Sequence, residues 1–294
     1  PLPQAPILPA QFVLRLVMAV LLILPVLLGV VSGLPEFARP APSSEILTVR
    51  QMIERLTPQS PVLFAIDYEP SYSGEMDAVS GAILGHLLRR NVYPVIISTV
   101  PTGPIQAERL LSLAGKTVGQ TLAPSDQYAN LGYLAGGATA LAAFVETPRT
   151  YLSLDIQGER VWDRPPLQNV NSAAQFAMVV VAVENPDRAR TWIEQLSPKL
   201  NDTPFVMVIS AQAEPLIRPY YDAAPSQVQG LVSGLTGAAA YEAATVQSGA
   251  ASLYWTPFNI GLLMAVLLMF LGGVINMIAG RIVRQKRRQE IKNK

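Results

Sequence analysis

Carboxylates and hydroxyls gather directly after four short apolar segments of this chain. In sequence order these polar residues are Asp67, Tyr68, Glu69, Ser98, Thr99, Glu184, Ser210 and Glu214. If the apolar segments are parallel strands, the side chains meet at one edge of a sheet, where open α/β folds bind ligands. We therefore treat these residues as candidate ligand-binding residues.

Four carboxylates around the first segment could hold a hard cation through oxygen ligands. They are Asp67, Glu69, Glu75 and Asp77. Their spacing matches no EF-hand loop, and Glu75 and Asp77 fall in the first turn of an expected helix, where negative charge complements the helix dipole. We favour this helix-end interpretation and predict no metal. Acid/base hydrolysis by Asp67 with Glu184 or Glu214 has no support from spacing.

Other catalytic groups are scarce in the sequence. The single histidine, His86, is expected in the second half of a helix, away from the strand ends, so we expect no Ser-His-Asp triad there. The absence of cysteine excludes a thiolate nucleophile and a Cys-ligated metal. We assign no catalytic residue and no cofactor.

Glycines at 230, 234 and 237 follow the last apolar segment and precede an expected helix. This is the context in which helix N-termini bind phosphate. The spacing is G-x-x-x-G-x-x-G rather than the dinucleotide G-x-G-x-x-G, and no Lys-Ser/Thr follows as in a P-loop. We keep Gly234 and Gly237 as speculative ligand-binding positions, and favour tight turns or close backbone packing as their role.

Alternating strands and helices must position these residues. Apolar runs predict strands at 62–66, 93–99, 128–133, 176–183, 205–210 and 229–232. Helical periodicity covers 75–90, 103–114, 136–145, 186–196 and 238–244. An amphipathic helix capped by Ser43 or Ser44 precedes them, and residues 151–162 are ambiguous, with an edge hairpin as one interpretation. This alternation predicts a mostly parallel sheet with helices on both faces, so we expect an α/β, Rossmann-like three-layer domain over residues 43–250.

Two long apolar runs flank the predicted domain, at residues 12–32 and 257–280. Each approaches the roughly 20 apolar residues that a spanning helix needs. We predict transmembrane helices within residues 1–33 and 251–281, and a proline-rich linker at 34–42. A signal peptide is the alternative for the first run, but its apolar core is longer than usual and no A-x-A site follows.

Charge predicts how the chain is oriented in the membrane. The tail at 282–294 is strongly basic, which indicates a cytoplasmic end. Two spans then place both termini in the cytoplasm and the domain outside it, at a plasma (inner) membrane. Residues 33–256 carry 14 basic and 20 acidic residues, a net charge of −6 that argues against nucleic acid as a partner.

Small and polar residues share one face of the second apolar run. They are Gly272, Asn276 and Gly280. Such a stripe allows helices to approach closely in lipid. We predict a helix contact here, either with the other span or with another subunit.

Three segments of the chain resemble an uncharacterised prokaryotic membrane-anchored family. They are 66–70 (IDYEP), 131–137 (LGYLAGG) and 230–242 (GLVSGLTGAAAYE). The similarity covers about residues 60–280. It implies terminal spanning helices around one α/β domain, and because no activity is known for the family it implies no catalytic residue.

The sequence leaves three functional interpretations open. The leading one is a non-enzymatic, membrane-anchored scaffold or accessory subunit of a larger membrane assembly, because no metal set, nucleophile–base pair or nucleotide fingerprint is present. The alternative is a sensor or carrier domain that binds a small molecule at the strand ends. The third is a hydrolase with an unfamiliar site.

Overall fold

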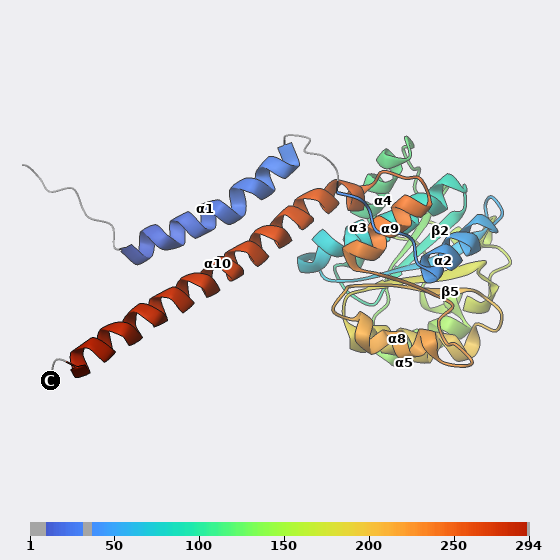
Figure 1. Cartoon of the computed structure of the whole chain (residues 1–294). Coiled ribbons are helices and arrows are strands. Elements are labelled where there is room, and N and C mark those ends of the chain that lie inside the picture. Colours follow the sequence, from blue (N-terminus) through green and yellow to red (C-terminus); the bar gives the residue numbers. More distant parts are fainter. Residues whose placement is uncertain (1–9, 32–36, 293–294) are drawn as a thin grey trace, which may run out of the picture. The chain divides into compact units, whose positions relative to one another are not determined.

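The computed structural model describes residues 10–31 and 37–292 (Figure 1). The chain divides into two compact units, which we describe separately. One is the domain Arg39–Ser252, and the other is formed by the two chain ends, Pro1–Ala38 and Leu253–Lys294.

A six-stranded parallel sheet forms the centre of the domain. Its strands are β1 (Pro61–Asp67), β2 (Tyr93–Ser98), β3 (Ala129–Tyr133), β4 (Met178–Val183), β5 (Phe205–Ile209) and β6 (Gly230–Ser233). Their order is β3-β2-β1-β4-β5-β6, so the connections reverse direction between β1 and β4. This confirms the predicted Rossmann-like α/β sheet and fixes the topological switch point at the carboxyl ends of β1 and β4.

Helices cover both faces of the sheet, as the three-layer prediction requires. They are α2 (Ser44–Glu54), α3 (Ser73–Arg89), α4 (Gly103–Thr117), α5 (Gly137–Glu146), α7 (Pro186–Leu196), α8 (Glu214–Asp222) and α9 (Gly234–Ala244). Helices α2, α3, α4 and α9 pack in one layer, and α5, α7 and α8 pack in the other. Figure 1 shows these two groups on opposite sides of the sheet.

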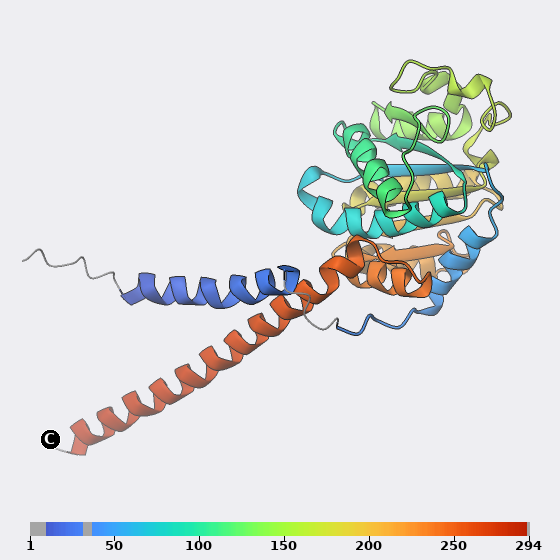
Figure 2. The same ribbon diagram turned by 90° about the horizontal axis from the view of Figure 1, so that it is seen from above.

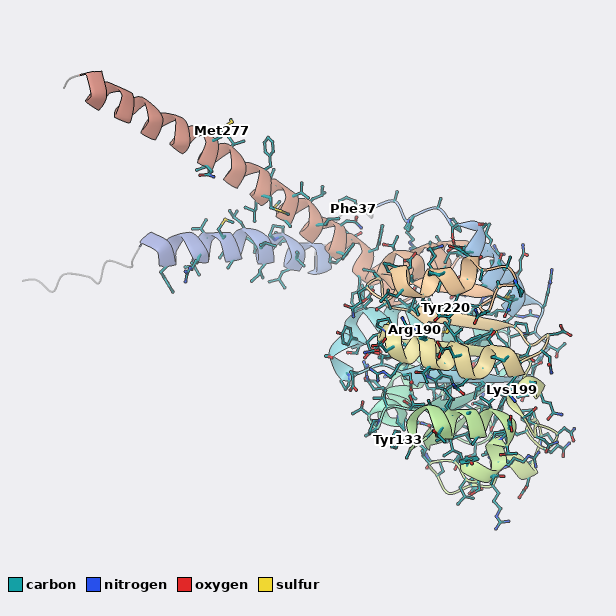
Figure 3. All side chains as sticks on the ribbon, turned by 90° about the horizontal axis from the view of Figure 1, so that it is seen from below. Phe37, Tyr133, Arg190, Lys199, Tyr220 and Met277 are labelled. Carbon is teal, nitrogen blue, oxygen red and sulfur yellow. The ribbon has the colours of Figure 1, made fainter. Side chains whose placement is uncertain are left out.

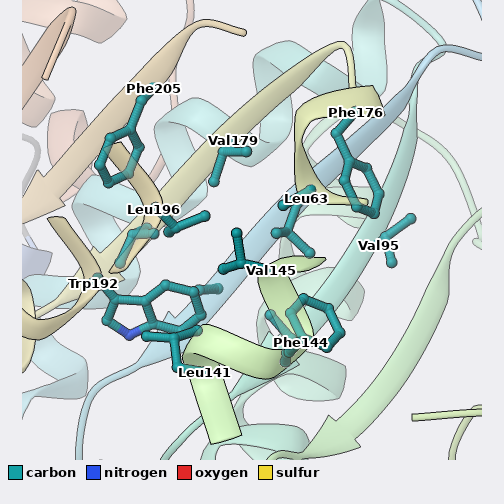
Figure 4. Close-up of a cluster of buried hydrophobic side chains, with 14 of the residues drawn as sticks. Leu63, Val95, Leu141, Phe144, Val145, Phe176, Val179, Trp192, Leu196 and Phe205 are labelled. Atoms are coloured by element: carbon teal, nitrogen blue, oxygen red, sulfur yellow. The ribbon is translucent and has the colours of Figure 1, made fainter. Parts of the chain in front are cut away.

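Burial on both faces explains why the strands read as continuous apolar runs. All six residues of β4 are buried, and so are all five of β5. On the face covered by α5 and α7, a buried cluster joins strand and helix side chains (Figure 4). Its largest members include Phe144, Trp192 and Phe205. The sheet edge that carries the candidate residues is therefore held by a well-packed core.

The first helix of the domain forms as predicted. The Ser43 hydroxyl caps α2 by accepting a hydrogen bond from the backbone N of Ile46. Ile46, Val49 and Ile53 are buried, and α2 packs on β6 and α9. The amphipathic stripe therefore belongs to the domain core.

Two segments differ from the sequence-based expectation. The edge hairpin at 151–162 is wrong, because this region contains only the short helix α6 (Pro148–Tyr151) and a 3-10 turn at Val161–Asp163. Its turn is held partly by a side chain, because the Asp155 carboxylate accepts from the backbone N of Gln157 and Glu159. Helix α8 was not predicted, because Pro215 and Pro219 obscure its pattern.

The chain ends form α1 (Ala10–Val31) and the 43-residue α10 (Ala250–Lys292). Among the described residues, one helix is long and apolar enough to cross a membrane, over Ala250–Met277. Residues Arg15–Gly29 form a shorter apolar helix. One candidate span is therefore present at the C-terminal end, and the span at the N-terminal end stays a prediction.

Candidate functional site

The strand-end residues lie at one end of the domain. In Figure 3, Tyr133, the last residue of β3, and Arg190, in the first half of α7, lie on the same side of the domain, whereas Lys199, which follows α7, lies toward the other side. The carboxyl ends of parallel strands share this edge, as the sequence analysis assumed.

Asp67, the last residue of β1, is fully buried and surrounded by donors. Its carboxylate accepts from the backbone N and hydroxyl of Thr99, the hydroxyl of Ser98, and Nε1 of Trp192 at 2.6 Å. Four donors satisfy a buried carboxylate, so its charge does not destabilise the fold. Asp67 therefore joins β1, β2 and α7, and it has no free position for a ligand.

Tyr68 also points into the protein. It is fully buried, and its hydroxyl donates to Asp77 at 2.8 Å. Burial and the neighbouring Asp77 carboxylate raise the pKa of Tyr68 well above its ordinary value. Asp77 in turn forms an ion pair with Arg109 at 2.6 Å. No group of three or more metal-ligating side chains occurs among the described residues.

Glu69, Glu184 and Ser210 meet at the switch point. Oε1 of the buried Glu184 accepts from Arg188 at 2.6 Å and from the backbone N of Glu69 at 3.4 Å. The Ser210 hydroxyl donates to the backbone O of Glu184 at 3.0 Å. The Glu69 side chain is 45% exposed, and its contacts are long, 3.8 Å to Arg188 and 3.4 Å to Thr102. Glu69 is therefore the most loosely held residue of this group.

Glu214 and Gly237 line a separate cavity of about 200 Å³ with Arg218. Arg218 bridges Glu214 and Glu45, at 2.5 and 2.8 Å, so its charge is already paired. Gly234 has a left-handed φ of +59°, and a Cβ there would lie 2.9 Å from the Cβ of Ala211. Both constraints favour glycine for packing rather than for a ligand.

His86 lies apart from these residues. It is buried, and its Nδ1 is 2.7 Å from the hydroxyl of Tyr241 on α9. Burial, with Arg89 nearby, lowers the pKa of His86 to about 4. The histidine is therefore neutral at pH 7 and serves the packing of α3 against α9.

Gly272 and Asn276 are the members of the predicted stripe on α10 whose surroundings the structure describes, and the helix contact itself stays a prediction. No atom lies within 4 Å of a Cβ built at Gly272, and Asn276 is exposed. The side-chain surroundings of position 280 lie outside the described residues. Helices α1 and α10 instead approach at Gly29, which faces Ile260, and at Gly261, which faces Val26.

A cavity lies in the segment after α5, where the sequence predicted no site. It has a volume of about 330 Å³ and is lined by Arg149, Ser153, Leu154, Arg160, Trp162 and Asp163. These residues fall in the ambiguous segment after α5, so no strand-end rule pointed to them. The sequence feature that could have indicated this site is the presence of two arginines and a tryptophan within 14 residues, 149–162.

The comparisons with known proteins assign no family. No protein-family model matches this chain, and no curated protein matches it in sequence. The fold is Rossmann-like α/β.

Proposed function

We propose that this chain is a non-enzymatic, membrane-anchored scaffold or accessory subunit of a larger membrane protein assembly. The observation that carries the proposal is how the strand-end side chains are used. Asp67 holds four donors, and Asp77 and Glu214 are ion-paired with Arg109 and Arg218. An acid or base of an enzyme must reach its substrate by a hydrogen bond, whereas these carboxylates are already occupied by donors of the domain itself.

Apolar side chains at the same edge add support. Large exposed residues follow or end four of the strands, namely Tyr72, Ile105, Tyr133 and Leu216. Ile105, in the first turn of α4, is 78% exposed. Exposed apolar side chains that gather on one surface are typical of protein contacts, so we assign this edge as the docking surface for another subunit.

Purification of the full chain in mild detergent tests the docking surface. We expect partner subunits to co-purify, and the double variant Ile105→Ser, Tyr133→Ser to lose them. Leu113→Ser is the matched control, because Leu113 is an exposed residue in the second half of α4. A monomer without partners on a native gel, or equal recovery with all variants, contradicts the proposal.

We further propose that α1 is a second span, that both termini are cytoplasmic and that the domain lies outside the cytoplasm, at the plasma (inner) membrane. The support is the basic tail after the apolar part of α10 and the position of Arg15 near the start of α1. Two spans return the chain to the side on which it started, and basic residues favour the cytoplasmic side.

Single-cysteine labelling tests this topology, because the chain has no cysteine of its own. In intact cells a membrane-impermeant maleimide should label Lys199→Cys in the domain. It should label Lys294→Cys in the tail only after permeabilisation. The reverse pattern, or labelling of both in intact cells, rules the topology out.

The alternative function is a sensor or carrier that binds a small molecule at the switch point. It is favoured by the half-exposed Glu69 and by Oε2 of the buried Glu184, for which the described residues offer no hydrogen-bond partner. A ligand-induced thermal shift that disappears in Glu69→Ala would establish this function. A shift that persists in the variant would exclude the switch point as the site.

A further inference from the structure

The segment between α5 and β4 is long and has little regular structure, yet it is tightly held. Figure 2 shows it in green and yellow-green at one edge of the domain. Arg149 fastens it by donating to the carbonyl oxygens of Leu167, Gln168 and Val170. Long loops that are ordered in compact domains usually have a function such as ligand binding. A binding site is therefore expected in this segment.

Two further contacts fix the first half of the segment. The buried Asp155 accepts from the hydroxyl of Ser125 at 2.6 Å as well as from two backbone N–H groups of its own turn. Trp162 is almost completely buried, and its Nε1 donates to the backbone O of Leu152 at 2.6 Å. The walls of the 330 Å³ cavity described above are therefore preorganised.

Besides Ser153, the side chains that line this cavity are of three kinds. Arg149 and Arg160 are cationic, Asp163 is anionic, and Trp162 with Leu154 is apolar. The guanidinium carbon of Arg149 lies 5.9 Å from the centre of the Trp162 ring. The volume falls within the range of small-molecule sites, in which a few polar groups orient a ligand against apolar walls.

The two arginines differ in what they can still bind. Arg149 is committed to three carbonyl oxygens. Arg160 is exposed, and in the described part of the chain its guanidinium has neither a hydrogen-bond nor an ion-pair partner. A guanidinium with all its donors free can bind a carboxylate through two parallel hydrogen bonds.

We propose that this cavity binds a free α-amino acid with an apolar side chain. Arg160 holds the carboxylate, with the positive charge of Arg149 beside it. Asp163 holds the ammonium group, and the apolar side chain packs on Leu154, which is 44% exposed, beside the small part of Trp162 that reaches the cavity. A zwitterion matches this set because it supplies one group of each charge together with an apolar part. The site goes beyond the proposed scaffold function and does not depend on it.

Calorimetric titration of the full chain in detergent with L-phenylalanine tests the site. We expect saturable binding, and Arg160→Gln should weaken it at least about tenfold, because the charged partner of the carboxylate is lost. Within residues 10–31 and 37–292 the Arg160 side chain makes no hydrogen bond or ion pair, so the variant should fold normally. Arg55→Gln is the matched control, since Arg55 is exposed, lies in a distant helix cap and also lacks a described side-chain partner.

Two analogues test the zwitterion directly. 3-Phenylpropionate lacks the ammonium group and phenethylamine lacks the carboxylate, so both should bind at least about tenfold more weakly than phenylalanine. Asp163→Asn should weaken phenylalanine and leave 3-phenylpropionate unchanged. No binding of phenylalanine at about 10 mM, equal binding to the wild type and Arg160→Gln, or equal binding of phenylalanine and 3-phenylpropionate would each overturn the proposal.

Discussion

The strand-end edge and the cavity after α5 use similar residue types in opposite ways. At the strand ends, Asp67 meets four donors within the fold, and the cations nearby are paired with carboxylates. In the loop cavity, Arg160 has no described partner. Parallel α/β sheets usually bind ligands at the carboxyl ends of their strands. Which side chains can still bind a ligand depends, however, on whether the fold has already paired them.

The largest expected change in stability is at Asp67, whose carboxylate is fully hydrogen-bonded at the strand-end edge. Asp67→Ala leaves the Thr99 hydroxyl, Nε1 of Trp192 and the backbone N–H of Thr99 without an acceptor, whereas the Ser98 hydroxyl can still donate to the backbone O of Val100. The variant should lower the free energy of unfolding by about 3–5 kcal/mol. Urea denaturation measures this. The exposed Glu194→Ala should change stability by less than about 0.5 kcal/mol. A loss below about 1 kcal/mol in Asp67→Ala would mean that the carboxylate is dispensable and free for other use.

The buried His86 is also paired within the fold, with Tyr241, and its protonation makes the stability of the domain depend on pH. The unfolded histidine binds a proton below its ordinary pKa of 6.5, whereas the folded one does so only near 4. Between these values the unfolded state binds more protons, so stability falls as the pH drops from about 6.5 to 4, by roughly 2–3 kcal/mol. His86→Gln should remove this part of the pH dependence in thermal unfolding. Parallel pH curves for both proteins would contradict it.

Replacing Arg149 tests how much this residue stabilises the loop that forms the cavity. Arg149→Gln removes donors to three carbonyl oxygens and should cost about 2 kcal/mol. Since these contacts lie within one loop, the loss should also increase protease cleavage within residues 152–171. Arg160→Gln should leave the cleavage rate unchanged. Equal rates for wild type and Arg149→Gln would show that the cavity walls have other supports.

The smallest expected effect is at Glu69, the loosest member of the strand-end edge. Glu69→Gln should change the free energy of unfolding by less than about 0.5 kcal/mol, because an exposed ion pair is screened by solvent. Comparing this variant with Asp67→Ala then distinguishes carboxylates that stabilise the fold from carboxylates that are free to bind a ligand at the same edge of the sheet. A cost above about 2 kcal/mol would place Glu69 among the structural residues.

The sheet could be predicted from the sequence because each strand is buried on both faces. Runs such as Met178–Val183 are continuously apolar for that reason. Helix α8 could not, since Pro215 and Pro219 interrupt its pattern while its stability comes from packing on neighbours. The positions of the strand-end residues could be predicted from the sequence, but their hydrogen-bond partners could not. The partner of Asp67 on α7 is Trp192, 125 residues further along the chain.

The loop after α5 has a consequence even when its cavity is empty. Strand β3 lies at the edge of the sheet, and such edges can pair with strands of other chains and start aggregation. The backbone N of Ile156 donates to the carbonyl oxygen of Asn130, within β3, at 2.8 Å. The loop therefore covers part of this edge, and shortening it should promote intermolecular pairing and lower solubility.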